Sequence, residues 1–161
     1  MHRLVCASME LVGRYEHITV QNSILWADVA HPINIGGHGD PDSATGEIVE
    51  KITFRNIDIL EHDEDDRDYQ GCMAINVGDH NLAQNITFED IRVEHIQEGQ
   101  LFHLRVMYNR KYNTGPGRGV RNIVFRNISC TGKFVNPSLF EGYDKDRKVE
   151  DILFENIVLN G

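Results

Sequence analysis

The sequence predicts an all-β fold, a right-handed parallel β-helix of about four to five coils that forms one domain over residues 1–161 as a short or partial solenoid. Two observations lead to this prediction. A nine-residue segment recurs five times, and in each copy apolar residues alternate as in a strand until an Asn or Asp shifts the pattern by one. Apolar residues make up 40% of the chain and charged residues 25%, which is typical of a folded domain.

The spacing of the repeats sets the length of a coil. The copies are HITVQNSIL, KITFRNIDI, NITFEDIRV, NIVFRNISC and DILFENIVL, with first isoleucines Ile18, Ile52, Ile86, Ile123 and Ile152. Successive isoleucines are therefore 34, 34, 37 and 29 residues apart. Helical repeats can also have a period of about 34 residues. Because β-branched and aromatic residues alternate within each copy, as Ile86 and Phe88 do, we expect strands instead.

Each repeat carries a predicted corner. The alternation slips between Phe88 and Ile91, and in the same way in the other copies. After glycine, Asn and Asp tolerate left-handed backbone angles best, and one of them stands at each slip: Asn22, Asn56, Asp90, Asn127 and Asn156. We expect a short strand on either side of this residue, with the side chains of successive corners stacked in a hydrogen-bonded ladder.

The segments between the repeats supply a third strand and a polar surface. The candidate strands are Met9–Leu11, Ile33–Gly36, Met73–Val77 and Leu101–Val106. Their alternation predicts an outward-facing polar stripe made of Glu10, Asn34, Ala74, Asn76, His103 and Arg105. Long connections flank this stripe, namely Gly36–Val49, Glu61–Gln70 and Tyr108–Gly119. A sheet bordered by long loops is typical of a groove for an extended ligand.

The coil pattern and one further strand resemble a known family. The repeated NITFxN pattern and the run Ala30-His31-Pro32-Ile33-Asn34-Ile35-Gly36 resemble glycoside hydrolase family 28, the polygalacturonase-like enzymes with a pectin-lyase-like solenoid. That family carries a strand of the type Gly-His-Gly-Ile-Ser-Ile-Gly, whose histidine supports the catalytic aspartates, and His31 stands at the matching position. The similarity covers most of the chain as the C-terminal coils of a longer β-helix. It implies acid/base hydrolysis of a glycosidic bond in a polysaccharide.

Two motifs of that family are missing here. Where the family has an Asp-Asp pair one coil earlier, the chain has Cys6-Ala7-Ser8-Met9-Glu10. Where the family has Arg-Ile-Lys one coil later, the chain has Ala74-Ile75-Asn76. Without these cations nothing at that place would pair with a uronic acid carboxylate, so polygalacturonate is not the expected substrate.

Glycoside hydrolysis generally needs two carboxyl groups, about 5–5.5 Å apart for retention and about 6.5–9.5 Å apart for inversion. The carboxylates nearest to the predicted groove are Glu10, Asp28 and Asp40, and Glu10 with either aspartate is the expected catalytic pair. His31 could orient or protonate one of them, because the pKa of histidine lies near neutrality.

Candidate substrate-binding residues follow from the stripe and its loops. Hydrogen bonds to sugar hydroxyls are expected from Asn34, His38, Asn76, His103 and Arg105. Tyr108 and Tyr112 could stack on sugar faces, whereas Trp26 follows two apolar residues and is expected to be packed. The predicted ligand is therefore a polysaccharide or oligosaccharide.

Other partners are disfavoured by composition. The net charge of −9 argues against a nucleic-acid partner. No apolar stretch has the length of a membrane span, so no membrane partner is expected. The residues after Met1 do not resemble a signal peptide, although the family resemblance suggests secretion, and the location therefore stays unknown.

No cofactor and no metal are predicted. The acidic loop with Asp63, Asp65 and Asp68 offers oxygen ligands for calcium, but it lacks the glycine and the final glutamate of an EF-hand. The three cysteines are far apart in the sequence and contain no CxxC pair, so we expect buried free thiols at Cys6, Cys72 and Cys130.

Three alternatives remain open at this stage. The chain could be a non-catalytic β-helix that binds glycan, or one that serves as an assembly module. A sugar epimerase or lyase would need a cation beside a uronate, and the stripe offers only Arg105. Because both ends of a short solenoid expose strand edges and apolar core, we also expect self-association through these ends.

Overall fold

The computed structural model describes residues 15–40, 42–132 and 136–159, and within these ranges the chain is all-β with no helix. Two parallel sheets account for the described strands. The strands are β1 (Tyr15–Ala27), β2 (Ile33–Gly36), β3 (Ile48–Asp63), β4 (Met73–Val77), β5 (Leu82–Val93), β6 (Ile96–Glu98), β7 (Phe102–Val106), β8 (Gly119–Cys130), β9 (Leu139–Glu141) and β10 (Val149–Leu159).

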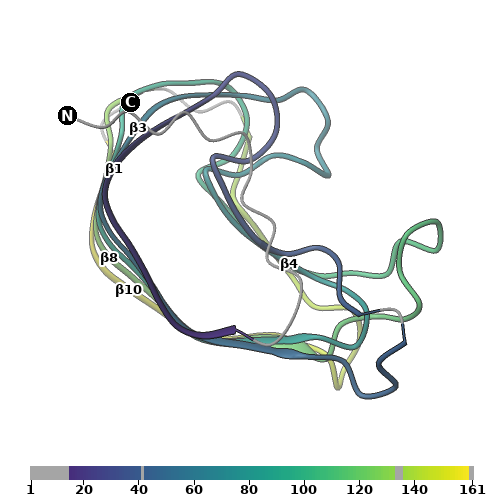
Figure 1. Ribbon diagram of the computed structural model, residues 1–161. Coiled ribbons are helices and arrows are strands. Elements are labelled where there is room, and N and C mark those ends of the chain that lie inside the picture. Colours follow the sequence, from purple (N-terminus) through teal and green to yellow (C-terminus); the bar gives the residue numbers. More distant parts are fainter. Residues whose placement is uncertain (1–14, 41, 133–135, 160–161) are drawn as a thin grey trace.

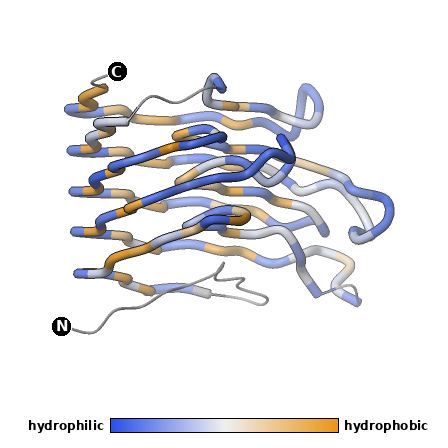
Figure 2. Tube along the Cα trace, turned by 90° about the horizontal axis from the view of Figure 1, so that it is seen from above, coloured by the Kyte–Doolittle hydropathy of each residue, from blue (hydrophilic) through white to orange (hydrophobic). Residues whose placement is uncertain are grey.

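The chain passes alternately through the two sheets. Sheet A has the order β1-β3-β5-β8-β10, with β6 also paired to β3, and sheet B has the order β2-β4-β7-β9. Every pairing between these strands is parallel. Viewed along the stack, successive passages superimpose around a central core (Figure 1), and from the side they form layered rungs (Figure 2). One passage through sheet A and the next through sheet B is called a coil below.

The register of sheet A confirms the predicted repeat. Ile18, Ile52, Ile86, Ile123 and Ile152 are successive partners across β1, β3, β5, β8 and β10. The steps of 34, 34, 37 and 29 residues therefore each correspond to one coil. The coils differ in length because the connections between their strands differ in length. These connections project from the side of the molecule on which sheet B lies (Figure 1).

The predicted corners are present in every repeat. Asn22, Asn56, Asp90, Asn127 and Asn156 have φ angles between 53° and 55°. The amide nitrogen of Asn56 donates to Oδ1 of Asn22 at 2.7 Å, and Asn127 donates to Asp90 at 2.9 Å. Asn156 donates in turn to Asn127 at 2.9 Å. Asp90 has no amide to donate, and Nη2 of Arg92 contacts Asn56 Oδ1 at 3.0 Å instead.

A second corner in each repeat was not predicted. The residue before the first isoleucine also has a positive φ, between 54° and 62°, at His17, Lys51, Asn85, Asn122 and Asp151. Three of the five are Asn or Asp, which is the same signal as at the first corner. Each long strand of sheet A is thus bent twice, and it stays paired with the same neighbouring strands across both bends.

Phenylalanines stack through the core along the axis. The rings of Phe54, Phe88, Phe125 and Phe154 follow one another at centroid distances of 5.2, 5.0 and 5.3 Å with nearly parallel planes. Phe54, Phe88 and Phe125 are at most 1% exposed. Phe154, on the last described strand, is 43% exposed. Each ring therefore completes its packing only when the next coil is present.

Two side-chain expectations can be compared with the fold. Cys72 and Cys130 are buried free thiols as predicted, and Cys6 lies outside the described residues. The expected packing of Trp26 is wrong, because this side chain is 45% exposed. Its neighbours Leu25 and Ala27 point inward, and alternation along β1 turns Trp26 outward. No helix among the described residues is long and apolar enough to cross a membrane.

Replacing Asn56 by Ala should lower the free energy of unfolding by about 1–3 kcal/mol, because Ala loses the ladder and must adopt a left-handed φ at a cost of ~1–2 kcal/mol. Asn56→Gly should cost less, since glycine adopts this φ without strain. Chemical denaturation measures the difference, and Arg55→Ala, at an exposed neighbouring position, should change stability by only about 0.5 kcal/mol. Equal losses for Ala and Gly would contradict a strained corner.

The predicted self-association stays a prediction, and Phe140 and Phe154 give it a surface, since they are 42% and 43% exposed at the β9 and β10 end of the two sheets. We expect sedimentation velocity to show a mass that rises with protein concentration. Phe140→Glu should weaken this association, whereas Tyr112→Glu, in the connection between β7 and β8, should leave it unchanged. A monomer at all concentrations would refute the prediction.

Candidate functional site

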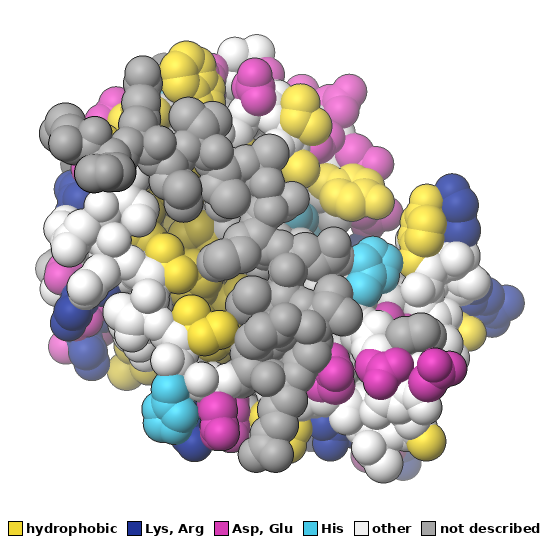
Figure 3. Space-filling view, in the orientation of Figure 1, with side chains coloured by type: hydrophobic (Ala, Val, Ile, Leu, Met, Phe, Trp, Pro, Cys, Tyr) yellow, Lys and Arg dark blue, Asp and Glu magenta, His cyan; other side chains and the backbone are white. Residues whose placement is uncertain are grey.

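A pocket of about 290 Å³ lies over sheet B. Its floor comes from β2 and β4, and its walls come from the β1–β2, β2–β3, β3–β4 and β7–β8 connections. The surface is hollowed between two projecting lobes, with a histidine and hydrophobic-coloured side chains at the rim (Figure 3). The lining residues are Ala30, His31, Asn34, Gly37, His38, Asp68, Tyr69, Asn76, Met107, Asn109, Tyr112 and Asn113.

An amide and a histidine form the floor of this pocket. The Asn76 amide nitrogen donates to Asn34 Oδ1 at 3.2 Å and lies 3.4 Å from Nε2 of His31. Nδ1 of His31 lies 3.2 Å from the carbonyl of Gly71. The tautomer with the proton on Nδ1 satisfies both contacts, since Nδ1–H then donates to Gly71 and Nε2 accepts from Asn76. Asn76 Oδ1 is buried and has no hydrogen-bond partner within the described residues.

Three buried histidines lie under and beside the floor. His31, His62 and His103 are at most 3% exposed, and the rings of His31 and His103 are 5.8 Å apart. His62 Nε2 accepts from the backbone of Gly71 at 3.1 Å, and His103 Nδ1 lies 2.9 Å from the Gln100 side-chain oxygen. The pKa of each histidine is lowered to about 4, mainly by burial, and for His62 and His103 the nearby His31 contributes to this lowering. All three are therefore neutral at pH 7.

Asp79 ties two walls of the pocket together. Its carboxylate is 2% exposed and accepts from Gly39 N at 3.0 Å, Asn113 Nδ2 at 2.8 Å and Thr114 N at 2.6 Å. Burial alone would raise the pKa of Asp79, but these hydrogen bonds outweigh burial and hold the pKa below its usual range. Asn113 also donates to Gly37 O at 3.1 Å. The connection after β2 and the connection after β7 thus form one rigid wall.

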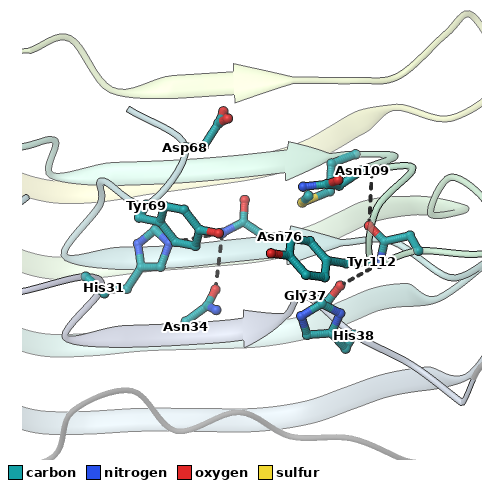
Figure 4. Close-up of a pocket in the computed structure, with 12 residues that line it drawn as sticks. His31, Asn34, Gly37, His38, Asp68, Tyr69, Asn76, Asn109 and Tyr112 are labelled. Atoms are coloured by element: carbon teal, nitrogen blue, oxygen red, sulfur yellow. Dashed lines mark hydrogen bonds between the residues drawn. The ribbon is translucent and has the colours of Figure 1, made fainter. Parts of the chain in front are cut away.

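Two tyrosines border the opening. Tyr69 and Tyr112 are 48% and 51% exposed, and in Figure 4 their hydroxyl groups point toward each other near Asn34 and Asn76. Tyr69 lies beside His31, with ring centroids 6.4 Å apart, and Tyr112 lies beside His38 at 6.0 Å. The pocket therefore offers aromatic surfaces at its mouth and amide groups at its floor.

One lining carboxylate is held in an ion-pair network. Asp68 Oδ1 contacts Arg105 Nη1 at 2.6 Å, and Glu141 Oε2 contacts Arg105 Nε at 2.8 Å. Arg105 follows Asn76 on the next strand of sheet B, as its register partner. Neither Arg105 nor Glu141 lines the pocket. The guanidinium is thus bound from two sides just behind the rim.

The pocket brings together several residues predicted from the sequence and leaves others apart. His31, Asn34, His38, Asn76 and Tyr112 line it. The expected catalytic aspartates do not: Asp28 and Asp40 are exposed outside the lining, and Asp40 accepts from the backbone of Asp42. Of the predicted sugar contacts, His103 is buried beneath the loops and Arg105 lies behind Asp68. Glu10 lies outside the described residues, as does the expected strand Met9–Leu11.

The prediction that the polar stripe is open to solvent is wrong. Asn34, Ala74 and His103 are register partners as expected, but Ala74 and His103 are fully buried and Asn76 is 5% exposed. The β3–β4 connection covers them closely, since a Cβ on Gly71 would lie 2.5 Å from Cβ of His103. Only a glycine at this position lets the loop approach so near. The groove is therefore narrowed to a pocket.

Several site residues were missed by sequence reasoning. Tyr69, Asn109, Asn113 and Asp79 come from loops whose path the repeat pattern does not set. Asp79 gave one signal, because an Asp directly after a strand and a glycine is typical of a turn, and its φ is 47°. The acidic loop uses its own carboxylates for such turns, since Glu64 and Asp66 accept backbone hydrogen bonds two residues on. Among the described residues, no three His, Cys, Asp or Glu side chains are grouped to hold a metal ion.

No protein-family model matches the chain, and no curated protein and no solved structure matches it. The resemblance to polygalacturonase-like enzymes therefore depends only on the repeated NITFxN pattern and the strand that follows His31.

The free energy of unfolding should fall by ~3 kcal/mol or more between pH 6.5 and pH 4. In this window the unfolded chain binds protons on His31, His62 and His103, whereas the folded chain, with a pKa of about 4 at each, does not. Urea titrations across this range measure the slope. His103→Gln should reduce the slope, while Arg55→Ala, which removes no group that titrates in this range from an exposed position, should leave it unchanged. A stability independent of pH would contradict the neutral state of these histidines.

Proposed function

We propose that this protein binds carbohydrate, with one sugar residue of a polysaccharide or oligosaccharide seated in the pocket over β2 and β4. The observation that carries the proposal is the combination of two half-exposed tyrosines with a floor of asparagine amides. Aromatic faces pack against the apolar faces of sugar rings, while amides donate to and accept from hydroxyl groups. A volume of about 290 Å³ is near the lower limit for small-molecule sites, ~300 Å³.

The fold that supports this site is proposed to be a right-handed parallel β-helix of the pectin-lyase-like type. Parallel strands linked through a crossover are right-handed in ~98% of cases, and the described coils consist of such crossovers between sheets A and B. The resemblance to glycoside hydrolase family 28 adds the expectation of a polysaccharide ligand, because His31 stands where that family has its supporting histidine and lines the pocket.

Glycoside hydrolysis is the second candidate function, and the network around Arg105 favours it. Asp68 and Glu141 are bound to the same guanidinium, so two carboxylates lie near one another beside the pocket. Two carboxyl groups are the minimal equipment for acid/base hydrolysis. Binding ranks first because Asp68 alone of this pair lines the pocket.

Tyr112→Ala should weaken sugar binding by roughly three- to tenfold, corresponding to the ~0.5–1.5 kcal/mol of an aromatic contact. Isothermal titration with cello-, xylo-, manno- and galacto-oligosaccharides measures the affinity. Tyr143→Ala is the matched control, because Tyr143 is 46% exposed outside the pocket lining and should not affect binding. If none of these sugars binds the wild-type protein, the proposed function is refuted.

Reducing-sugar release from the same oligosaccharides separates binding from hydrolysis. We expect binding without release of new reducing ends. Release that is lost in Asp68→Asn but retained in Asp28→Asn would establish the second candidate, since only Asp68 lines the pocket.

A further inference from the structure

We infer that the pocket selects an uncharged sugar residue and discriminates against a uronic acid, because the arginine nearest to Asn76 in register is already neutralised by Asp68 and Glu141. This inference rests on the proposed carbohydrate-binding function and names the substrate class of that site.

The residues that line the pocket offer no positive charge to an anionic ligand. No lysine or arginine is among the twelve described residues that line the pocket, and Asp68 contributes a negative charge. His31 is neutral at pH 7, since burial lowers its pKa to about 4. A carboxylate that enters such a pocket loses hydration without gaining a counter-charge, which is unfavourable. The lining thus disfavours an anionic ligand.

Arg105 and Lys111 are cations near the rim of the pocket, and neither is free to bind a carboxylate at its floor. Arg105 has contacts of 2.6 Å to Asp68 and 2.8 Å to Glu141, so a uronate would have to compete with two carboxylates for it. The Lys111 ammonium lies 4.7 Å from the centre of the Tyr112 ring on an exposed side chain. Water and salt screen such an exposed charge strongly. Neither cation is placed as a free partner for a carboxylate on the pocket floor.

The pocket floor carries an acceptor without a hydrogen-bond partner, Oδ1 of Asn76. Asn76 is 5% exposed and lines the pocket, and its Oδ1 has no hydrogen-bond partner within the described residues. Its amide nitrogen already serves Asn34 and His31, so this side chain can only accept from a ligand. Sugar hydroxyls donate to such an acceptor, whereas a carboxylate offers only further acceptors. The floor therefore favours a hydroxyl donor over a carboxylate.

Matched ligands test this selectivity on the full-length chain. Fully methyl-esterified oligogalacturonides and their de-esterified free-acid forms share one backbone and differ in charge. A second pair consists of cello-oligosaccharides and the oligoglucuronides obtained from them by oxidation at C6. Isothermal titration at pH 8, where histidines with ordinary pKa values are neutral, gives the affinities. We expect the neutral member of a pair to bind at least about tenfold more tightly than the acid.

Variants of the ion-pair network test its cause. The double variant Asp68→Asn/Glu141→Gln frees the Arg105 guanidinium and should reduce the discrimination by about tenfold, through stronger binding of the acid form. Asp146→Asn/Glu150→Gln removes the same number of charges from exposed positions outside the pocket and should leave the discrimination unchanged. Lys111→Gln should also leave it unchanged. Circular dichroism confirms that each variant is folded before titration.

The titrations distinguish failure of the selectivity from failure of carbohydrate binding itself. Preferential binding of neutral sugars that is lost in the Asp68/Glu141 variant supports the inference. Equal or tighter binding of the free acids by the wild-type protein overturns it and leaves the carbohydrate-binding function intact. Binding of neither member of either pair, and of no sugar in the wider panel, refutes the proposed function and the inference with it.

Discussion

The fold depends on the left-handed corner that recurs at the same position of every repeat. A parallel stack can continue only if each coil turns where the coil below it turns, because a displaced corner would break the register on both sides. The backbone at Asn22, Asn56, Asp90, Asn127 and Asn156 has nearly one φ value. Asn and Asp adopt it at low cost, and their short side chains reach the neighbouring corner. The same five residues thus provide both the bend and part of the adhesion between coils.

The regularity of sheet A leaves sheet B and its connections free to vary. Inward positions repeat apolar residues, most clearly in the stack of Phe54, Phe88 and Phe125, so each coil has a similar cross-section. The difference between steps of 29 and 37 residues is absorbed outside the paired segments. The pocket is built from these variable connections on a floor of short strands, as is usual for binding sites on rigid scaffolds.

Polar groups buried around the pocket give it a fixed shape at a cost in stability. Three neutral histidines lie in the interior near Gly71, and Asp79 accepts hydrogen bonds from two loops at once. Buried groups of this kind are tolerated when hydrogen bonds satisfy them. Among the described residues, Asn76 Oδ1, His62 Nδ1 and His103 Nε2 are buried without a hydrogen-bond partner. A floor that hydrogen bonds already hold in place before a ligand binds lowers the entropic cost of binding.

The sequence by itself determined the repeated strands of sheet A, one corner in each repeat and the pairing of the coils, because these follow from local alternation and from an Asn or Asp at a fixed place in each repeat. It also indicated His31, Asn34, His38 and Asn76 as ligand-binding candidates, since all four lie on or beside two adjacent strands, β2 and β4. Only the tertiary structure decided which carboxylate faces the pocket. Asp68 reaches the rim and Asp28 and Asp40 do not, because long loops fold according to contacts distant in sequence, such as Asp68 with Arg105, which no local pattern specifies.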